Sequence, residues 1–248
     1  MRIAFDLDGV LADLHTPFVR TAARLFPELD PAAIGAADVG ASPPPDADTG
    51  SDDSEGQLAP ALPHVSLSRR QTDHVWRDIA ATPDFWETLA EIEPGAIAKL
   101  ASVADSRGWE VLFITSRPRS AGRTVQRQSQ RWLQQCGFPL PSLYVVHGSR
   151  GRIAEALAID VVVDDRPDNC LDIVLESKAG ALLVWRGDQA AVPISAKRLG
   201  IAVVPTVAAV LEALIEAERA TDGGGGMLDR LRRMFGLKTK SASPLVRS

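Results

Sequence analysis

The amino terminus of the chain, MRIAFDLDGVLAD, constrains the fold more than any other stretch. Residues 2–5 form a short apolar run with β-branched and aromatic members, which is typical of a buried strand. The run stops at Asp6, Asp8 and Gly9, so the strand carries two carboxylates to its carboxyl end. Side chains alternate along a strand, which places the two acids on one side, about 6 to 7 Å apart. Packing does not need them, so they indicate a site.

Two aspartates at this spacing repel each other unless a cation or a bound group lies between them. Mg²⁺ suits such a place because it is a hard ion that binds carboxylate oxygens and keeps positions open for water or phosphate. Gly9 permits a tight turn directly after the acids. The alternative is a strand end that carries two solvated aspartates. We expect Asp6 and Asp8 to be metal ligands.

A second apolar run, WEVLFI at residues 109–114, ends at Thr115, Ser116 and Arg117. A hydroxyl at the end of a parallel strand, followed by a turn and a helix start, is a natural site for a phosphate oxygen. Thr115 is the first candidate for this role and Ser116 the second. Arg117 either binds the substrate or forms a local ion pair.

A third run, DVVV at residues 160–163, ends at Asp164 and Asp165. These carboxylates would arrive from a neighbouring strand and complete an oxygen-rich pocket for one Mg²⁺. Three or four aspartates that converge at strand ends are hard to explain by structure alone. The sequence therefore predicts one anionic site built from several strand ends.

The motifs FDLDG, ITSRP and VVVDD, in this order, resemble those of the haloacid dehalogenase (HAD) superfamily of phosphohydrolases. The resemblance covers about residues 1–215. It implies that Asp6 is the nucleophile and Asp8 the general acid and base, and that a phosphoaspartate forms. The family's magnesium site then matches Asp6, Asp8, Asp164 and Asp165, and its phosphate-binding hydroxyl matches Thr115.

One motif of the family is missing. The family has a lysine shortly before its last acidic motif, and this sequence has none there. The basic residues at hand are Arg150 and Arg152. Either guanidinium can supply the positive charge, and its fork can bind two phosphate oxygens, although its geometry differs from that of a lysine.

The segments TPDFWETLAEIEPGA and ITSRP resemble the corresponding segments of the 5′(3′)-deoxyribonucleotidase branch of the family. That branch places aromatic residues against the base or sugar, and Phe85 and Trp86 are the matching positions. The alternative is that both aromatic residues pack cap against core, because aromatic pairs are strong core formers.

Strands and helices alternate along the chain, which predicts an α/β fold, a three-layer Rossmann-like arrangement with a mostly parallel sheet. We expect a small helical cap inserted after the first strand, with a disordered acidic loop at about 42–63. The expected division is a core at 1–13 and 91–220, a cap at 14–90, and a glycine linker with a basic amphipathic tail at 221–248.

The composition of the chain limits the size of its core and the kinds of partner that it can bind. The 248 residues are 45% apolar, enough for one sizeable core or for a core with a small cap. The net charge of −5 argues against a nucleic acid polymer. No run of 18 apolar residues occurs, so we expect no transmembrane segment and a cytoplasmic protein.

The tail leaves several partners open. Residues 227–238 are expected to form a basic amphipathic helix that contacts an anionic membrane surface or a protein groove, or that docks on its own domain. A homodimer is also left open.

The resemblance implies a Mg²⁺-dependent hydrolase of a small phosphate ester. A 5′-nucleotide or deoxynucleotide is the leading substrate, and another small phosphomonoester stays open beside it. The rival is a weak or inactive HAD-like binding module that is recruited through its carboxyl-terminal helix. The missing lysine favours the rival, and the full set of aspartates weighs against it. Only the enzyme needs Asp6 as a nucleophile.

Overall fold

The computed structural model describes residues 1–28, 67–219, 230, 231 and 233, which form two compact units. The sheet unit comprises Met1–Ala12, Ala90–Ser116 and the described part of Leu133–Ser248. The helical unit comprises the described part of Asp13–Leu89 together with Arg117–Trp132. The sequence division placed residues 117–132 in the core, whereas here they belong to the helical unit. The expected acidic loop and glycine linker lie outside the described residues.

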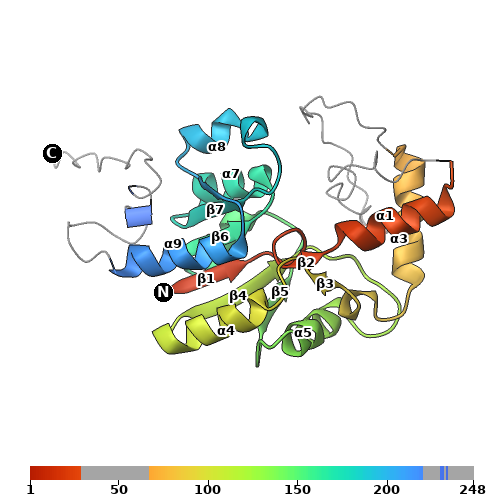
Figure 1. The fold of residues 1–248 in the computed structure, drawn as a ribbon, viewed down its shortest axis with the longest axis horizontal. Coiled ribbons are helices and arrows are strands. Elements are labelled where there is room, and N and C mark those ends of the chain that lie inside the picture. Colours follow the sequence, from red (N-terminus) through yellow and green to blue (C-terminus); the bar gives the residue numbers. More distant parts are fainter. Residues whose placement is uncertain (29–66, 220–229, 232, 234–248) are drawn as a thin grey trace. The chain divides into compact units, whose positions relative to one another are not determined.

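Six strands form the sheet, in the order β5-β4-β1-β6-β7-β8 (Figure 1). Across the sheet they are β5 (Ser142–Val145), β4 (Glu110–Thr115), β1 (Arg2–Phe5), β6 (Val161–Asp164), β7 (Gly180–Val184) and β8 (Ala202–Val204). Each neighbouring pair is parallel. The predicted α/β class with a mostly parallel sheet is confirmed.

The register brings three strand ends to one place. Phe5 at the end of β1 lies opposite Phe113 of β4 and Val163 of β6. The chain builds the sheet outward from β1 through β4 to β5, and then returns to β6 on the other side of β1. In such sheets ligands bind outside the carboxyl ends of the strands, where the strand order reverses. The residues that follow these three ends are therefore the candidates for a site.

Helices cover both faces of the sheet. On one face α6 (Arg150–Ala156), α7 (Pro167–Glu176) and α8 (Ile194–Arg198) share a core with strand residues such as Ala4, Val162 and Leu183. The alternate strand residues, including Ile3, Phe5 and Phe113, are completely buried as well. Helices α4 (Ala96–Arg107) and α9 (Val207–Arg219) pack against each other, and α9 also packs on β7 and β8. Strands buried on both faces need continuous apolar runs, which is what the sequence shows.

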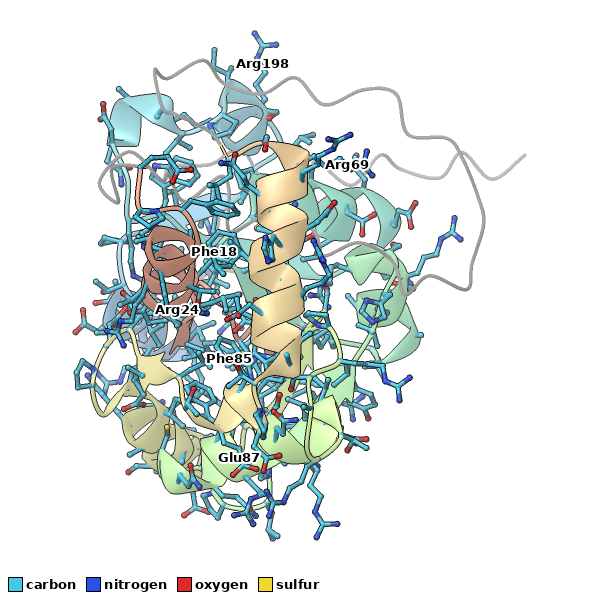
Figure 2. The ribbon with its side chains drawn as sticks, turned by 90° about the vertical axis from the view of Figure 1, so that its right-hand side faces the viewer. Phe18, Arg24, Arg69, Phe85, Glu87 and Arg198 are labelled. Atoms are coloured by element: carbon cyan, nitrogen blue, oxygen red, sulfur yellow. The ribbon has the colours of Figure 1, made fainter. Side chains whose placement is uncertain are left out.

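The helical unit is organised around α1 (His15–Leu25) and α3 (Arg69–Ala81), which lie side by side (Figure 2). The rings of Phe18 and Trp76 meet between them with centroids 5.4 Å apart. Arg24 forms an ion pair with Asp78. Ser68 caps α3 by accepting from the Gln71 N–H, and the Gln71 side chain accepts from the Ser68 N–H.

Short elements complete both units. A 3₁₀ turn, η2 (Phe85–Glu87), follows α3, and Figure 2 labels both of its end residues. Strands β2 (Ala12–Asp13) and β3 (Ala90–Glu91) pair as a separate two-stranded sheet. The chain leaves the sheet unit within β2 and returns to it at the start of β3. It leaves again after Ser116 and returns after Trp132.

Helix α5 spans Val125–Gln135, and Ala121 lies before its start. Ala121 uses its backbone elsewhere: its N–H donates to the Ala80 carbonyl at 2.7 Å, and its carbonyl accepts from Asp84 N–H at 2.8 Å. Gly122 has a φ of +93°, and a Cβ there would lie 2.4 Å from the Asp84 carboxylate. This contact with the turn after α3 replaces the first helical turn.

The described part of the tail packs within the sheet unit. Leu231 is 4% exposed, and Arg230 donates to the Ala217 carbonyl in α9 at 3.1 Å. The rest of the tail helix expected at 227–238 lies outside the described residues, apart from residue 233. Contact with a membrane or a partner stays a prediction. Among the described helices, none has the length and apolar character needed to cross a membrane.

Candidate active site

An ion pair between Asp6 and Arg150 lies at the centre of the site. Asp6 follows β1, and its N–H donates to the Val163 carbonyl at 2.9 Å, which extends the sheet by one bond. Arg150 Nη2 donates to Asp6 Oδ1 at 3.0 Å and to Ser116 Oγ at 2.9 Å. Both charged side chains are buried. Arg150 Nη1 is also buried, and no described residue accepts a hydrogen bond from it.

The close packing of α6 on α7 holds Arg150 in place. Ser149 caps α6 by accepting from Arg152 N–H at 3.0 Å, and the Gly151 N–H donates to Asp172 Oδ2 at 2.9 Å. A Cβ at Gly151 would lie 2.4 Å from the Asp172 carbonyl, so only glycine allows this approach. The contact fixes the first turn of α6, from which Arg150 points to Asp6.

Asp8 lies beside Thr115, the last residue of β4. The Thr115 hydroxyl donates to Asp8 Oδ2 at 3.4 Å, and Thr115 itself is almost completely buried. Asp8 stands in a tight turn, because the N–H groups of Leu11 and Ala12 both donate to the Leu7 carbonyl, at 2.8 and 2.7 Å. The turn holds the second aspartate next to the end of the neighbouring strand.

Asp164 ends β6 and is fixed by its own backbone neighbourhood. Its Oδ1 accepts from Arg166 N–H at 2.8 Å, and Asn169 Nδ2 lies 3.1 and 3.0 Å from its two oxygens. Sequence reasoning missed Asn169. Its position in the first turns of α7, just after the acidic pair, is the only signal that pointed to it.

The carboxylates crowd one another. Burial raises the pKa of Asp6 well above its usual value, and the negative charges of Asp164, Asp165 and Asp8 raise it further, whereas Arg150 lowers it. Burial also raises the pKa of Asp164, against the effect of Arg150. Burial and the charge of Asp164 raise the pKa of Asp165 to about 7. One guanidinium does not balance this many acids.

The donor chemistry of this cluster fits Mg²⁺, which prefers carboxylate oxygens. In the described part of the chain, no group of three or more His, Cys, Asp or Glu side chains is arranged to hold a metal ion. The excess of buried negative charge around Asp6 is nevertheless the condition that a divalent cation relieves. Asp6, Asp8, Asp164 and Asp165 are the residues that would hold it.

Arg152 lies away from this cluster. Its side chain is 81% exposed and pairs with Glu176 at 3.1 Å. Two residues along a helix correspond to a rotation of about 200°, so Arg150 and Arg152 face nearly opposite directions. Of the two arginines that the sequence offered, the structure brings Arg150 to Asp6.

Phe85, Trp86 and Arg117 lie inside the helical unit. The guanidinium of Arg117 stacks 4.8 Å from the Trp86 ring centroid and 5.5 Å from that of Trp132. Arg117 Nη1 donates to Ser129 Oγ at 2.9 Å, and Trp86 Nε1 donates to the Pro118 carbonyl at 3.1 Å. All three predicted residues are buried, and Trp86 completely so. Trp132 and Ser129, which complete this packing, were not predicted.

Comparisons with protein-family models and with curated proteins found no match. Solved structures do resemble the chain. One is a HAD family hydrolase from Deinococcus radiodurans R1 with bound phosphate and sodium: its TM-score is 0.53 at 18% identity, and the match covers 90% of this chain and 98% of that one. Another is a hydrolase from Pseudomonas syringae, with a TM-score of 0.50 at 15% identity, covering 87% and 99%.

At this level of identity the likeness concerns the fold. The chain has the α/β fold of the HAD hydrolase from Deinococcus radiodurans, with a mostly parallel sheet between helices. The acids at the carboxyl ends of β1 and β6 and the hydroxyl at the end of β4 define the candidate site on this fold.

Proposed function

We propose that the chain is a Mg²⁺-dependent phosphomonoester hydrolase that acts through a phosphoaspartate on Asp6. One observation carries the proposal: the buried guanidinium of Arg150 joins Asp6 to Ser116, and its Nη1 has no acceptor among the described residues. A phosphoryl oxygen is a strong acceptor for such a donor. The same guanidinium then binds the nucleophile and the group that it attacks.

The reaction has two halves. Asp6 attacks phosphorus in line and forms an acyl phosphate, while Asp8 protonates the leaving oxygen. Asp8 then takes a proton from the water that hydrolyses the intermediate. The contact from the Thr115 hydroxyl supports this role, because it holds the Asp8 carboxylate at the strand ends.

The phosphoryl group needs positive charge around it. Arg150 supplies one charge, and we expect the Ser116 hydroxyl, which accepts from Arg150, to donate its proton to a phosphoryl oxygen. The Thr115 hydroxyl would do the same only by exchanging its long bond to Asp8 for one to the phosphoryl group. Mg²⁺ held by Asp6, Asp8, Asp164 and Asp165 would neutralise the carboxylates and the phosphate as they approach. Asn169 and the Arg166 N–H keep Asp164 oriented for this task.

The substrate that we propose is a small phosphate ester, and a 5′-nucleotide is the leading candidate. The phosphate bound to the Deinococcus radiodurans hydrolase supports a phosphorylated ligand for this fold. The proposal of a nucleotide as the substrate is based only on the sequence around Phe85 and Trp86, which resembles that of the deoxyribonucleotidase branch. Since both side chains are buried in packing, base recognition needs other residues.

The binding module is a second candidate, favoured by the arginine in place of the family's lysine. In that case the site holds phosphate or Mg²⁺ without turning over an ester. The two functions differ at Asp6, because only hydrolysis needs its carboxylate as a nucleophile.

The test is phosphate release from nucleoside monophosphates and sugar phosphates, with Mg²⁺ or with EDTA, beside an Asp6→Asn variant. Release that needs Mg²⁺ and is lost in the variant supports the hydrolase, and the preferred ester defines the substrate class. If no ester is hydrolysed while Mg²⁺ still binds, the binding module replaces the hydrolase.

A further inference from the structure

Arg186 binds the turn that follows Asp8. It lies two residues beyond the end of β7, in the sheet unit. Its Nη1 donates to the Gly9 carbonyl at 2.6 Å and its Nη2 to the Val10 carbonyl at 3.0 Å. One planar guanidinium therefore holds two consecutive carbonyls, a geometry that the fork of an arginine matches and a lysine does not.

Glu93 fixes the guanidinium from the other side. Arg186 Nη2 donates to Glu93 Oε1 at 2.7 Å. The Glu93 carboxylate also accepts from the N–H groups of Val207 and Ala208, at 2.8 and 3.2 Å, in the first turn of α9. Carboxylates are favourable at a helix amino terminus. Glu93 thereby connects Arg186 to a rigid helix.

The electrostatics of Glu93 agree with this anchoring. Burial raises the pKa of Glu93, but the hydrogen bonds from Val207, Arg186 and Ala208 outweigh that effect, and the pKa lies below its usual value. The carboxylate is therefore charged at neutral pH, as an ion pair requires.

The turn that Arg186 holds belongs to the FDLDG motif, which contains Asp8. Gly9 has a φ of +82°, its N–H donates to the Ala12 carbonyl, and Asp8 precedes it directly. Asp8 receives the hydroxyl of Thr115 at the long distance of 3.4 Å. Because Asp8 directly precedes Gly9, a shift of the turn backbone moves the Asp8 side chain away from Thr115.

We propose that Arg186 and Glu93 are positioning residues that hold the Gly9–Val10 turn, and through it the Asp8 carboxylate, in place for proton transfer. This inference rests on the proposed hydrolase function. Neither residue needs to touch the substrate. The expected effect is selective, because only the steps in which Asp8 gives or takes a proton should slow, and kcat/KM reports the first of these, proton donation to the leaving oxygen.

The test compares leaving groups. An alkyl phosphate needs a proton on its leaving oxygen, whereas p-nitrophenyl phosphate has a good leaving group and needs little help. For Arg186→Gln we expect kcat/KM to fall on the order of tenfold to a hundredfold with the alkyl ester, because small misplacements of an acid cost this much, and to fall less with the aryl ester. Asp8→Asn should show the same selectivity.

Two further variants distinguish a displaced Asp8 carboxylate from a general loss of activity. Arg107→Gln breaks an ion pair with Glu218 in the same unit and should change both esters equally or not at all. Arg186→Lys keeps the charge but loses the fork, and should recover part of the activity toward the alkyl ester. Equal losses on both esters in Arg186→Gln would overturn the inference.

Hydrogen exchange supplies a measurement without activity. In Arg186→Gln, exchange at the amides of residues 9–12 should become faster, while exchange in α4 and β4 stays as in the parent. If the parent hydrolyses no ester, the proposed function fails. In that case unchanged exchange at residues 9–12 would also overturn the inference that Arg186 holds the Gly9–Val10 turn, and faster exchange confined to these residues would support it.

Discussion

Gly9 and Asp165 lie so close together that a Cβ atom at Gly9 would be 1.9 Å from Asp165 Oδ2. Gly9 also has a φ of +82°, a conformation that side chains disfavour. Two features therefore require a glycine at position 9: its backbone conformation and the closeness of the Asp165 carboxylate. Through this contact the conformation of the turn at Gly9 limits where the Asp165 carboxylate can lie.

Gly9→Ala should therefore damage both stability and activity. The left-handed backbone costs about 1 to 2 kcal/mol with a side chain, and the clash moves the Asp165 carboxylate in addition. We expect kcat/KM to fall at least about tenfold, since displaced catalytic groups lose this much. Thermal unfolding and phosphate release measure the two effects.

Gly95→Ala is the matched control. Gly95 has a φ of +80°, but nothing lies within 4 Å of a Cβ placed there. This variant should lose stability through backbone strain alone and keep its activity. Equal activity losses in both variants would contradict the role of the Gly9–Asp165 contact.

Arg150→Ala should cost activity through the loss of charge-assisted hydrogen bonds. Each such bond contributes about 1.5 to 3 kcal/mol, which corresponds to roughly a tenfold to hundredfold loss of kcat/KM. Arg150→Lys should retain part of the rate. Arg152→Ala, two positions along the same helix, removes an exposed pair with Glu176 and should have no effect. The prediction is wrong if Arg152→Ala is the more damaging variant.

Trp86→Phe should affect stability but not substrate binding. The change removes the Nε1 bond to Pro118 and leaves a gap beside Arg117. We expect unfolding to become easier by about 1 to 3 kcal/mol, with KM for the preferred ester unchanged. A higher KM at unchanged stability would instead place Trp86 against the substrate.

Without metal, the stability of the chain should fall as pH rises. An unfolded aspartate has a pKa of about 3.9, whereas burial and Asp164 raise the pKa of Asp165 to about 7 in the folded chain. Between these values the folded chain binds more protons, so the free energy of unfolding falls from about pH 4 to about pH 7. Thermal unfolding in EDTA at several pH values measures this loss of stability. In Asp165→Asn the stability should fall less over the same pH range.

Added Mg²⁺ should reverse this trend. It binds deprotonated carboxylates, so it should raise the unfolding temperature more above about pH 7 than below about pH 5. An equal effect of Mg²⁺ at both pH values would contradict a site made from these acids.

The strands and their ends were predictable, because strands buried on both faces leave continuous apolar runs. Asp6, Thr115 and Asp164 each end or follow such a run, and neighbouring parallel strands end at one edge. The choice between Arg150 and Arg152 was left open. The helical period alone separates the two, once the helix is known to begin at Arg150.

Other features depend on contacts that sequence patterns do not show. The burial of Trp86 and Arg117 depends on Trp132 and Ser129, which come from a different helix. Arg186 binds backbone carbonyls, and no side-chain motif reveals such partners. The start of α5 at Val125 likewise depends on the backbone bonds of Ala121 to Ala80 and Asp84.

The most direct test of the account is to trap the phosphoryl group on Asp6. Asp8→Asn lacks the base for the second half of the reaction, and p-nitrophenyl phosphate does not need its acid for the first half. Acid quenching of this variant with Mg²⁺ and labelled ester, followed by peptide mapping, should place a hydroxylamine-sensitive label on Asp6. Phosphate release by the parent chain with no label on Asp6, or a label that persists in Asp6→Asn, would contradict the account.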